Sequence, residues 1–394
     1  MRSLSQAVFW LSGAALAYTQ VGYGLLLAVL ARRTPRPAAP SDSGPRAPGP
    51  EPPSAAAPTV SVIVAAYREQ KGIAARIANL RALEHPADRL EVIVACDGSP
   101  DATPTAAREA GADVVLELPR GGKVRAQDAG VRRARGQILA FSDANARWAP
   151  DALVHLLAPF ADPRVGYVCG QVSFKSSGGT NQEGAYWRYE MWLRELESGL
   201  HSVTGGNGAI YATRREAYIE VDPIMGHDLS FPFNMVKRGW RAVYAPDALA
   251  TETMVPSIEG EFARKRRMMS HGWPIVLRGG LLELRAYPPL YALMLVSHRA
   301  LRYATPALHL TLLAASLGLT RARRGRVYAA ALALQLALLA AAAAADSPAA
   351  PARARRPLLL ARYYVLTTAS LAAGLLDWLR EGTEAGWEPA EGTR

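Results

Sequence analysis

The sequence predicts a doubly wound α/β domain that is attached to a membrane by transmembrane helices. Three observations predict this: residues 60–256 alternate short apolar runs with helical periodicity, long uncharged stretches lie before and after them, and a proline-rich segment follows the first stretch. The chain has 394 residues, 50% hydrophobic and 20% charged. It is therefore too apolar to be disordered and long enough for about two domains.

The charge balance is basic, with 45 Lys and Arg against 34 Asp and Glu and a formal net charge of +11. Such a balance suits nucleic acid, an anionic lipid surface or an anionic small substrate. Many arginines stand beside the uncharged stretches, as in loops that flank membrane helices. The sequence has no zinc-finger spacing and no aromatic RNA-binding signature, so we expect no nucleic-acid partner. Only Cys96 and Cys169 occur, too few for a disulfide framework or a four-cysteine zinc site, which indicates a reducing compartment.

The first predicted element is a transmembrane anchor within residues 1–33. Positions 7–31 carry no charge and lie between Arg2 and Arg32, and a span needs about 20 apolar residues. A cleaved signal peptide is the alternative, but the run is longer than the usual apolar core and Ala-Arg-Arg is a poor cleavage site. Residues 34–59 hold nine prolines among Ala, Ser and Gly, a composition typical of an extended linker.

The α/β domain is expected over residues 60–256. Short apolar runs predict strands at 60–65, 91–95, 114–117 and 137–142. One helix face is marked by Ile73, Ile77, Leu80 and Leu83. Ligands of such sheets bind at the carboxyl ends of the strands, so we expect the functional residues just beyond these ends.

The pattern changes after Pro256. Residues 257–303 are basic and amphipathic, and their apolar stretch 287–297 is short for a span and suits the membrane interface. Residues 304–378 hold three further candidate spans, which bring the expected count to four, and 379–394 form a tail. The three spans are 304–320, 327–345 and 358–378, the last interrupted by Arg362.

The expected topology contains a conflict. With the α/β domain in the cytosol, the arginine-rich loop 321–326 lies on the far side of the membrane, against the positive-inside tendency. Either 287–297 belongs to a hairpin that changes the parity, or the tendency yields locally to the large domain and to the basic loop 353–356.

Polar residues follow the expected strand ends in a recurrent order. The strings are VSVIVAAYRE (60–69), VIVACDGSPDAT (92–103), GGKVRAQDAGVRRARGQILAFSDAN (121–145), GGNGAIYA (205–212), GHDLSFPFNMVKRGWRAVYAPDA (226–248) and EFARKRRM (261–268). Together they resemble the family 2 inverting glycosyltransferases of GT-A fold, particularly the membrane-bound branch that includes cellulose, chitin and hyaluronan synthases. The resemblance covers residues 60–270. It implies a Rossmann-like nucleotide-diphospho-sugar transferase domain, a hexosyl or N-acetylhexosaminyl transferase, and a place in polysaccharide biosynthesis.

Asp143 and Asn145 leave the fourth expected strand. Positions i and i+2 of an extended chain project to one side, so the carboxylate and the amide oxygen can both bind one hard cation, which in turn bridges to a diphosphate. The family's motif is Asp-x-Asp, so the resemblance implies a Mg2+ or Mn2+ site on Asp143, with Asn145 in place of the second acid. A polar turn after a strand is the alternative.

Four further residues are expected to bind the donor. The resemblance implies that Asp97 accepts a hydrogen bond from the nucleotide base and that Tyr67 and Glu69 line the same pocket. For Glu69 the alternative is a solvated loop acid. Lys123 opens a helix, where free N–H groups and a positive charge suit a diphosphate, and the alternative is an exposed basic helix.

Asp228 is the expected catalytic base. The spacing of Leu229, Phe233 and Val236 predicts a helix with Asp228 at its beginning. Inversion at an anomeric carbon needs one carboxylate to take the proton of the acceptor hydroxyl. The family's acidic pair falls at His227-Asp228, and its second acid is the base. His227 in place of the first acid either changes the proton affinity of its neighbour or contacts the acceptor, and Asp228 as a plain N-cap is the alternative reading.

Two arginines and one asparagine complete the expected site. Arg264–Met268 occupy the place of the synthases' Gln-x-x-Arg-Trp motif, which implies that Arg267 neutralises the departing diphosphate. Arg264 stands for the Gln and is expected among the substrate-binding residues. A membrane-surface patch for anionic lipid is the alternative for this basic run. Met268 replaces the tryptophan that supports the acceptor sugar, which argues against processive extension, and Trp273 is a candidate substitute. The resemblance implies that Asn207, in the glycine loop, lies near the acceptor.

The sequence therefore predicts a multi-pass inner-membrane enzyme with a cytoplasmic catalytic domain. It would transfer a sugar with inversion from a nucleotide sugar, with UDP as the expected nucleotide, to a lipid-linked or growing polysaccharide acceptor. Membrane lipids and polysaccharide-export proteins are the other expected partners. Two alternatives stay open: a processive synthase that exports its polymer, and a non-catalytic nucleotide-sugar-binding subunit of an assembly complex.

Overall fold

The computed structural model describes residues 2–33, 57–175, 182–253, 258–345 and 352–386. The chain divides into two units. The helical unit holds Met1–Leu26, Ser177–Trp192 and Val255–Thr383, and the α/β unit holds Leu27–Ser176, Leu193–Met254 and Glu384–Arg394. Most of the predicted linker and half of the predicted tail lie outside the described residues.

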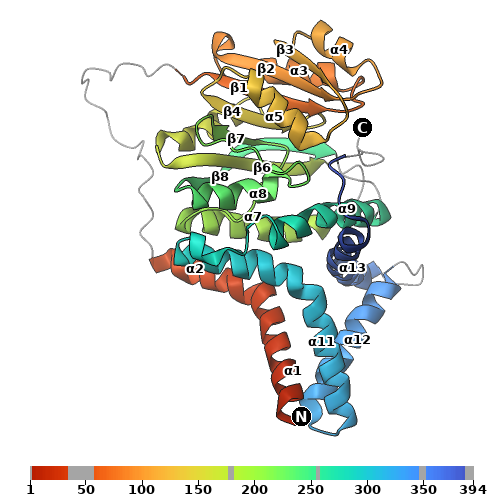
Figure 1. Ribbon diagram of the computed structural model, residues 1–394. Helices are drawn as coiled ribbons and strands as arrows, with labels where there is room; N and C mark the ends of the chain where they lie inside the picture. The colour runs from red at the N-terminus through yellow and green to blue at the C-terminus, as the bar shows by residue number, and fades with distance from the viewer. Residues whose placement is uncertain (1, 34–56, 176–181, 254–257, 346–351, 387–394) are drawn as a thin grey trace. The chain divides into compact units, whose positions relative to one another are not determined.

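The α/β unit is built on a sheet whose described strands follow the order β3-β2-β1-β4-β7-β6-β8-β5 (Figure 1). The strands are β1 Val60–Ala66, β2 Leu90–Asp97, β3 Val114–Leu118, β4 Ile138–Asp143, β5 Arg147–Trp148, β6 Val165–Lys175, β7 Tyr211–Arg214 and β8 Arg241–Thr253. Strands β1 to β4 are parallel, β7 is antiparallel to β4 and β6, β8 is parallel to β6, and β5 is antiparallel to β8. The four strands predicted from apolar runs are confirmed, with nearly the same ends.

Every residue of β1 and β2 is buried, as expected for parallel strands that are covered on both faces. Helices α3 (Ile73–Arg81) and α4 (Thr103–Glu109) connect β1 to β2 and β2 to β3, and α5 (Lys123–Arg133) returns from β3 to β4. Because such crossovers are right-handed, the reversal of direction puts α5 on the opposite face from α3 and α4. The reversal lies between β1 and β4, the place where open α/β sheets bind ligands.

The predicted apolar face of α3 is confirmed. Ile73, Ile77 and Leu80 are fully buried, and Leu83, just beyond the helix, is 5% exposed. Three more helices complete the unit: α6 (Ala152–Leu157), α8 (His227–Lys237) and the part of α7 (Gln182–Leu200) that follows Trp192. Short 3-10 turns are Ala87–Arg89 and Ala158–Ala161.

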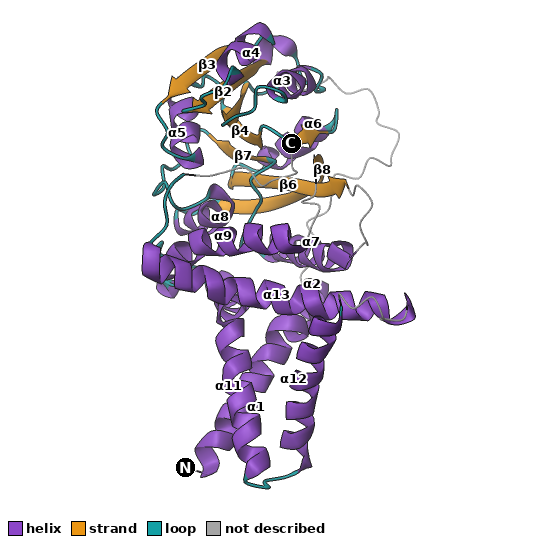
Figure 2. Ribbon diagram, turned by 90° about the vertical axis from the view of Figure 1, so that its right-hand side faces the viewer, coloured by secondary structure: helices purple, strands orange, loops and turns teal. Residues whose placement is uncertain are grey.

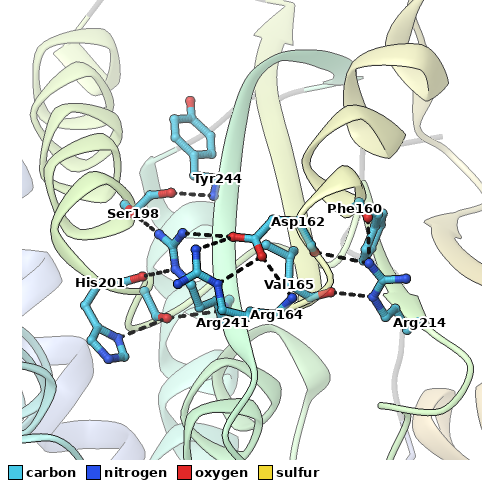
Figure 3. Close-up of polar contacts among 11 residues, drawn as sticks. Phe160, Asp162, Arg164, Val165, Ser198, His201, Arg214, Arg241 and Tyr244 are labelled. Atoms are coloured by element: carbon cyan, nitrogen blue, oxygen red, sulfur yellow. Dashed lines mark hydrogen bonds and ion pairs between the residues drawn. The ribbon is translucent and has the colours of Figure 1, made fainter. Parts of the chain in front are cut away.

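Arginines hold the amino ends of β6 and β8 (Figure 3). Arg214 donates to the carbonyl oxygens of Phe160, Asp162 and Val165 at 2.5, 3.1 and 2.8 Å. Arg241 donates to the carbonyl oxygens of Ser198 and His201 at 3.0 and 3.1 Å. These bonds satisfy carbonyl groups that the sheet does not pair, which explains why arginines lie at the ends of buried strands.

Both cysteines are buried in strands. Cys96 in β2 is 1% exposed and Cys169 in β6 is 0% exposed, and neither forms a disulfide. Burial raises the pKa of the Cys96 thiol to about 12. The thiol therefore stays protonated at neutral pH, so it is a poor nucleophile.

The helical unit contains α1 Arg2–Ala17, α2 Tyr23–Arg33, α9 Ile258–Leu277, α10 Pro289–Leu295, α11 Leu301–Arg321, α12 Arg326–Ala344 and α13 Ala352–Glu381, with α2 shared between the units beyond Leu26. A 3-10 turn, Leu284–Ala286, precedes α10. Helices α1, α11 and α12 run side by side, whereas α13 crosses them (Figures 1 and 2). Helix α13 packs along α9, where Trp273 Nε1 donates to the Leu371 carbonyl at 2.8 Å and Arg266 pairs with Asp377 at 2.6 Å.

Three described helices are long and apolar enough to cross a membrane: Leu4–Arg33, Arg326–Ala344 and Arg353–Glu381. They contain the predicted anchor and most of the predicted spans 327–345 and 358–378. The predicted span 304–320 lies in α11, which is not among them, so the expected count of four is not reached. Polar side chains such as Thr305, His309 and Thr311 lower the apolar content of α11.

The predicted interfacial stretch 287–297 is not one arm of a hairpin. It continues from α10 through a π-helical turn, Val296–Ala300, into α11 as one helical run. A second π-helical turn, Tyr18–Gly22, joins α1 to α2, and Tyr18 Oη lies 2.8 Å from Ser297 Oγ. The two π-helical turns are thus joined by this hydrogen bond within the helical unit.

Candidate active site

The carboxyl ends of β1, β2 and β4 are level with one another. Ala65 of β1 is paired in register with Ala95 of β2 and with Asp143 of β4. Asp97 and Asp143 therefore end neighbouring strands, and Tyr67 directly follows the strand between them, at one edge of the sheet. The start of α5 belongs to the same edge, because the amides of Gly121 and Gly122 donate to Asp97 Oδ1 at 2.7 and 3.0 Å. The structure brings together residues that the sequence presents in separate strings.

Asp97 shapes the turn that starts α5. It is 1% exposed, and its Oδ2 also accepts from Arg120 Nη1 at 2.9 Å. The turn needs glycine at position 122, whose φ of 97° and ψ of 161° belong to a region that other residues avoid. In this structure the Asp97 carboxylate orders the amides of the expected phosphate-binding turn, and its contact with a nucleotide base stays a prediction.

Arg120 is a site residue that the sequence analysis missed. Its guanidinium carbon lies 3.4 Å from the centre of the Tyr67 ring, and its Nη1 pairs with Asp97. A cation over an aromatic face is stabilised by about 0.5–2 kcal/mol. Arg120 thereby joins two residues predicted for the base pocket, and its only sequence signal was a basic residue directly before the glycine turn.

Glu69 is not a solvated loop acid, so that alternative is wrong. The residue is 8% exposed, and its amide donates to Thr103 Oγ1 at 2.8 Å. Its carbonyl accepts from the Ile73 amide at 2.9 Å, which closes the first turn of α3. The pocket role that the resemblance implies stays a prediction.

Lys123 is the first residue of α5, and its ammonium group forms an ion pair with the Asp143 carboxylate. Each of these side chains is 29% exposed, so Lys123 is not part of an exposed basic helix. Burial alone would lower the pKa of Lys123, but Asp143, then Asp228 and Glu252, raise it above its ordinary value. Lys123 therefore stays protonated at neutral pH and interacts with two of the predicted site acids.

Asp143 and Asn145 fit a hard divalent cation. Both offer oxygen ligands of the kind that Mg2+ and Mn2+ prefer, Asp143 is partly exposed and Asn145 is exposed. Among the residues that the structure describes, no three His, Cys, Asp or Glu side chains gather as a metal site. The chain alone thus offers few ligands here, and the other coordination positions would fall to a diphosphate and to water.

The glycine loop 205–208 approaches this ion pair through its backbone. The Asn207 amide is used within the loop region, since Nδ2 donates to the Gly170 carbonyl at 2.7 Å and Oδ1 accepts from the Ile210 amide at 2.9 Å. A Cβ at Gly208 would lie 3.0 Å from Lys123 Nζ and 3.6 Å from Asp143 Oδ2. Asn207 therefore shapes the loop, and its predicted closeness to the acceptor stays a prediction.

The N-cap of α8 is Gly226, so the alternative of Asp228 as a plain N-cap is wrong. Asp228 lies in the first turn, where its backbone carbonyl accepts from the Gly206 amide at 2.6 Å. This bond joins the glycine loop to α8. Together with the electrostatic link to Lys123, it gathers Asp97, Asp143 and Asp228 around the start of α5.

His227, the neighbour of Asp228 in the chain, is held in an aromatic cluster. It is 4% exposed, its ring stacks on Phe231 with centroids 4.0 Å apart, and its Nδ1 lies 2.8 Å from Tyr211 Oη. Burial, then the charge of Lys123, lowers the pKa of His227 to about 3. The ring is therefore neutral at neutral pH, and it is too buried to contact an acceptor as one of the two expectations held.

Arg264 and Arg267 lie on α9 of the helical unit, whereas the residues above belong to the α/β unit. The contact of Arg267 with a diphosphate and the place of Arg264 among the substrate-binding residues stay predictions. Trp273 on the same helix is 8% exposed, donates to the Leu371 carbonyl and meets Tyr303 edge to face at 5.0 Å. It belongs to the packing of the helices, so the suggestion that it supports an acceptor sugar is wrong.

Residues 61–222 match the model of glycosyl transferase family 2. This part of the chain is a family 2 glycosyltransferase domain. The match begins in β1 and ends shortly before α8, so it contains Asp97, Lys123, Asp143 and Asn207 but not Asp228.

The fold of the chain is similar to that of a mannosyltransferase from Pyrobaculum calidifontis, solved in complex with GDP-Man and Mn2+. The TM-score is 0.69 at 24% identity, and the alignment covers 95% of this chain and 99% of that one. The similarity confirms the predicted fold class, a GT-A-like α/β domain of Rossmann type combined with apolar helices.

Two curated relatives are similar to parts of the sequence. An N-acetylglucosaminyltransferase of Rhizobium meliloti is 27% identical over 267 residues, 62% of each chain. A beta-monoglucosyldiacylglycerol synthase of Trichormus variabilis is 31% identical over 170 residues, 41% of this chain and 36% of its own length. The chain thus spans less than two thirds of the length of these relatives.

Proposed function

We propose that the protein transfers a sugar with inversion from a nucleotide sugar to a hydroxyl group of a lipid-linked acceptor. The observation that carries this proposal is the start of α5, where Lys123 pairs with Asp143 and interacts with Asp228, and where the Gly121 and Gly122 amides are ordered by Asp97. Phosphate, cation and base functions are thus available around one turn.

The donor half of the site would stabilise a leaving diphosphate. Lys123 keeps its proton, and the N–H groups of a helix start add a favourable dipole for an anion. Asp143 and Asn145 would hold a divalent cation, which when bound neutralises charge that develops on the diphosphate. The oxygen donor set of this chain and the Mn2+ named with the Pyrobaculum enzyme both support that assignment.

The acceptor half would be served by Asp228. Its carboxylate takes the proton of the acceptor hydroxyl while the new bond to the anomeric carbon forms and the bond to the diphosphate oxygen breaks. The neutral ring of His227 stands where the family has an acid, so no like charge adjoins the base. The Gly206–Asp228 bond keeps the glycine loop next to this carboxylate.

A lipid-linked acceptor is favoured by the apolar helices. In α12, Leu334 and Leu336 are 73% and 52% exposed, on a helix long enough to cross a membrane. The Trichormus relative is a synthase of a glucosylated diacylglycerol. A membrane-bound enzyme meets lipid acceptors at high local concentration, which supports this class over a soluble one.

The proposal is tested with the full chain purified in detergent. A panel of labelled UDP- and GDP-sugars with Mn2+ or Mg2+ and membrane lipids should label the lipid extract, and label in long water-soluble chains would instead indicate a processive synthase. Asp228→Asn should lower the transfer rate about 100- to 10,000-fold while nucleotide binding is kept. Asp222→Asn, an exposed acid before the same helix, is the matched control and should transfer normally.

Chelation tests the cation separately. EDTA should abolish transfer, and added Mn2+ or Mg2+ should restore it. Full transfer in EDTA would contradict the role given to Asp143 and Asn145, whereas an active Asp228→Asn protein would contradict the role of the base.

A further inference from the structure

Helix α3 contacts both ends of the turn that carries Asp143 and Asn145. At the first end, Arg76 Nη2 donates to Ser142 Oγ at 2.7 Å, and Ser142 Oγ donates to the Asp143 carbonyl at 3.0 Å. Arg76 is 3% exposed although it is charged. Ser142 is the last residue before the expected cation ligand, so this contact fixes where the turn begins.

At the other end, one side-chain amide satisfies the backbone of Trp148. Asn79 Nδ2 donates to the Trp148 carbonyl at 2.9 Å, and the Trp148 amide donates to Asn79 Oδ1 at 2.9 Å. Arg76 Nη1 also donates to Asn79 Oδ1, and the Arg76 guanidinium lies 5.1 Å from the centre of the Trp148 ring. The two ends of the turn are therefore held by two neighbouring side chains of one helix.

Trp148 carries the connection onward to the glycine loop. It is 1% exposed, and its Nε1 donates to the Ala209 carbonyl at 2.9 Å. Ala209 follows Gly208, the residue that lies against Lys123 and Asp143. A chain of buried contacts thus runs from α3 through the turn to the loop on the other side of the ion pair.

We propose that Arg76, Asn79 and Trp148 are positioning residues that set the turn 142–148 and the loop 205–208 at the spacing needed to bind a cation with its diphosphate. The inference rests on the proposed function, because it takes Asp143 and Asn145 as the cation ligands. These two residues lie between the two ends of the turn, so the positions of its ends decide where their oxygens stand.

The cost of burying Arg76 supports a role beyond packing. A buried charge costs several kcal/mol unless it is well compensated. Arg76 Nε is buried without a hydrogen-bond partner in the structure, and the acid that acts on its charge is Asp143. An apolar side chain would fill the space below Trp148 more cheaply, but it could not bond to Ser142 and Asn79 together.

The test measures Mn2+ binding directly, by the loss of the free Mn2+ signal in electron paramagnetic resonance. The full chain in detergent is titrated with Mn2+ in the presence of UDP or GDP, whichever the wild-type protein binds. Asn79→Ala should weaken Mn2+ binding about 10- to 100-fold, the usual effect of removing a residue that orients a ligand. Nucleotide binding without cation should change less than twofold, because the Asp97 turn is untouched.

Arg76→Lys keeps the positive charge but loses the guanidinium that bonds to Ser142 and Asn79 together. This variant should therefore also weaken Mn2+ binding. It decides the question when Asn79→Ala is not recovered as folded protein. The matched control is Arg214→Lys, since Arg214 also bridges backbone groups but does so at the amino end of β6 (Figure 3). The control should lower thermal stability and leave Mn2+ binding unchanged.

Two failures are distinguishable. Wild-type Mn2+ binding in both Asn79→Ala and Arg76→Lys, with stability lowered as in the control, would show that these residues only pack the core and would overturn the inference. A wild-type protein that binds no Mn2+ with nucleotide and transfers sugar in EDTA would overturn the cation site itself, and with it the proposed function of Asp143.

Discussion

His227 links the stability of the fold to pH. Burial and Lys123 lower its pKa to about 3 in the folded protein, against about 6.5 in an unfolded chain. Between these values the unfolded chain binds a proton that the folded chain does not, so this residue makes stability fall as the pH falls from about 6.5 to about 3. The expected slope is about 1.4 kcal/mol per pH unit.

His227→Gln should remove that slope. The difference in unfolding free energy between variant and wild type, followed by thermal unfolding in detergent, should shrink steadily as the pH is lowered below about 6.5. Burial raises the pKa of Asp128 to about 6, which lowers stability as the pH rises from about 4 to 6, but both proteins share this effect. Parallel pH profiles for the two proteins would contradict a neutral, buried His227.

Gly122 is required by its backbone and by its neighbour. Its φ and ψ belong to a glycine-only region, and a Cβ would lie 2.0 Å from the Ala385 carbonyl oxygen. Strain of this kind costs about 1–3 kcal/mol. Gly122→Ala should therefore weaken nucleoside diphosphate binding about tenfold, measured by calorimetry. Gly199→Ala, which has no atom within 4 Å of the new Cβ, should bind normally, and equal affinities for the two variants would refute the argument.

Single residues were predictable where chemistry and position agreed. Asp143 stands at the end of a strand and Lys123 at the beginning of a helix. A carboxylate at the first place and an ammonium group at the second are typical of a site that binds a cation and a phosphate. Arg76 and Asn79 could not be found in this way, because a basic residue and an amide on an amphipathic helix normally face solvent. Their role depends on Trp148, which is far away in the sequence and close only in the fold.

Trp273 connects α9 to α13. Trp273→Phe keeps the ring contact with Tyr303 but removes the bond to the Leu371 carbonyl. We expect a loss of about 0.5–1.5 kcal/mol in stability, because one buried hydrogen bond between α9 and α13 is removed while the Leu371 carbonyl stays within its helix. The transfer rate and the KM for the acceptor should change less than twofold. A selective rise in the acceptor KM would restore Trp273 as a support for the sugar.

The elements themselves were predictable to different degrees. Strands β1, β2 and β4 are buried on both faces, so their apolar runs stand out from the sequence. Helix α13 is also apolar over a long stretch, yet it crosses α11 and α12 and pairs Asp377 with Arg266 of α9 (Figure 2). Length and composition predict that a helix forms, whereas its direction depends on which neighbouring helix it packs against.

The apolar helices predict firm attachment of the protein to a bilayer. Only 11% of the most apolar 18-residue stretch of the helix Arg326–Ala344 is buried inside the protein. Exposed apolar surface of this extent is stable in lipid and unstable in water. The full chain should stay with the membrane pellet after an alkaline carbonate wash and leave it only with detergent. Release by carbonate alone would argue for a peripheral protein.

Because both native cysteines are buried, thiol-reactive reagents should leave the folded wild-type protein unlabelled. Maleimide reagents need an accessible thiolate, and neither Cys96 in β2 nor Cys169 in β6 offers one. A single cysteine introduced at Arg324, in the basic loop between α11 and α12, would then be the one group that an impermeant dye can tag in sealed vesicles. Labelling of this cysteine would show that loop 321–326 lies outside the vesicle, and absence of labelling would show that it lies inside. The experiment thus decides the membrane orientation that the positive-inside tendency leaves in conflict.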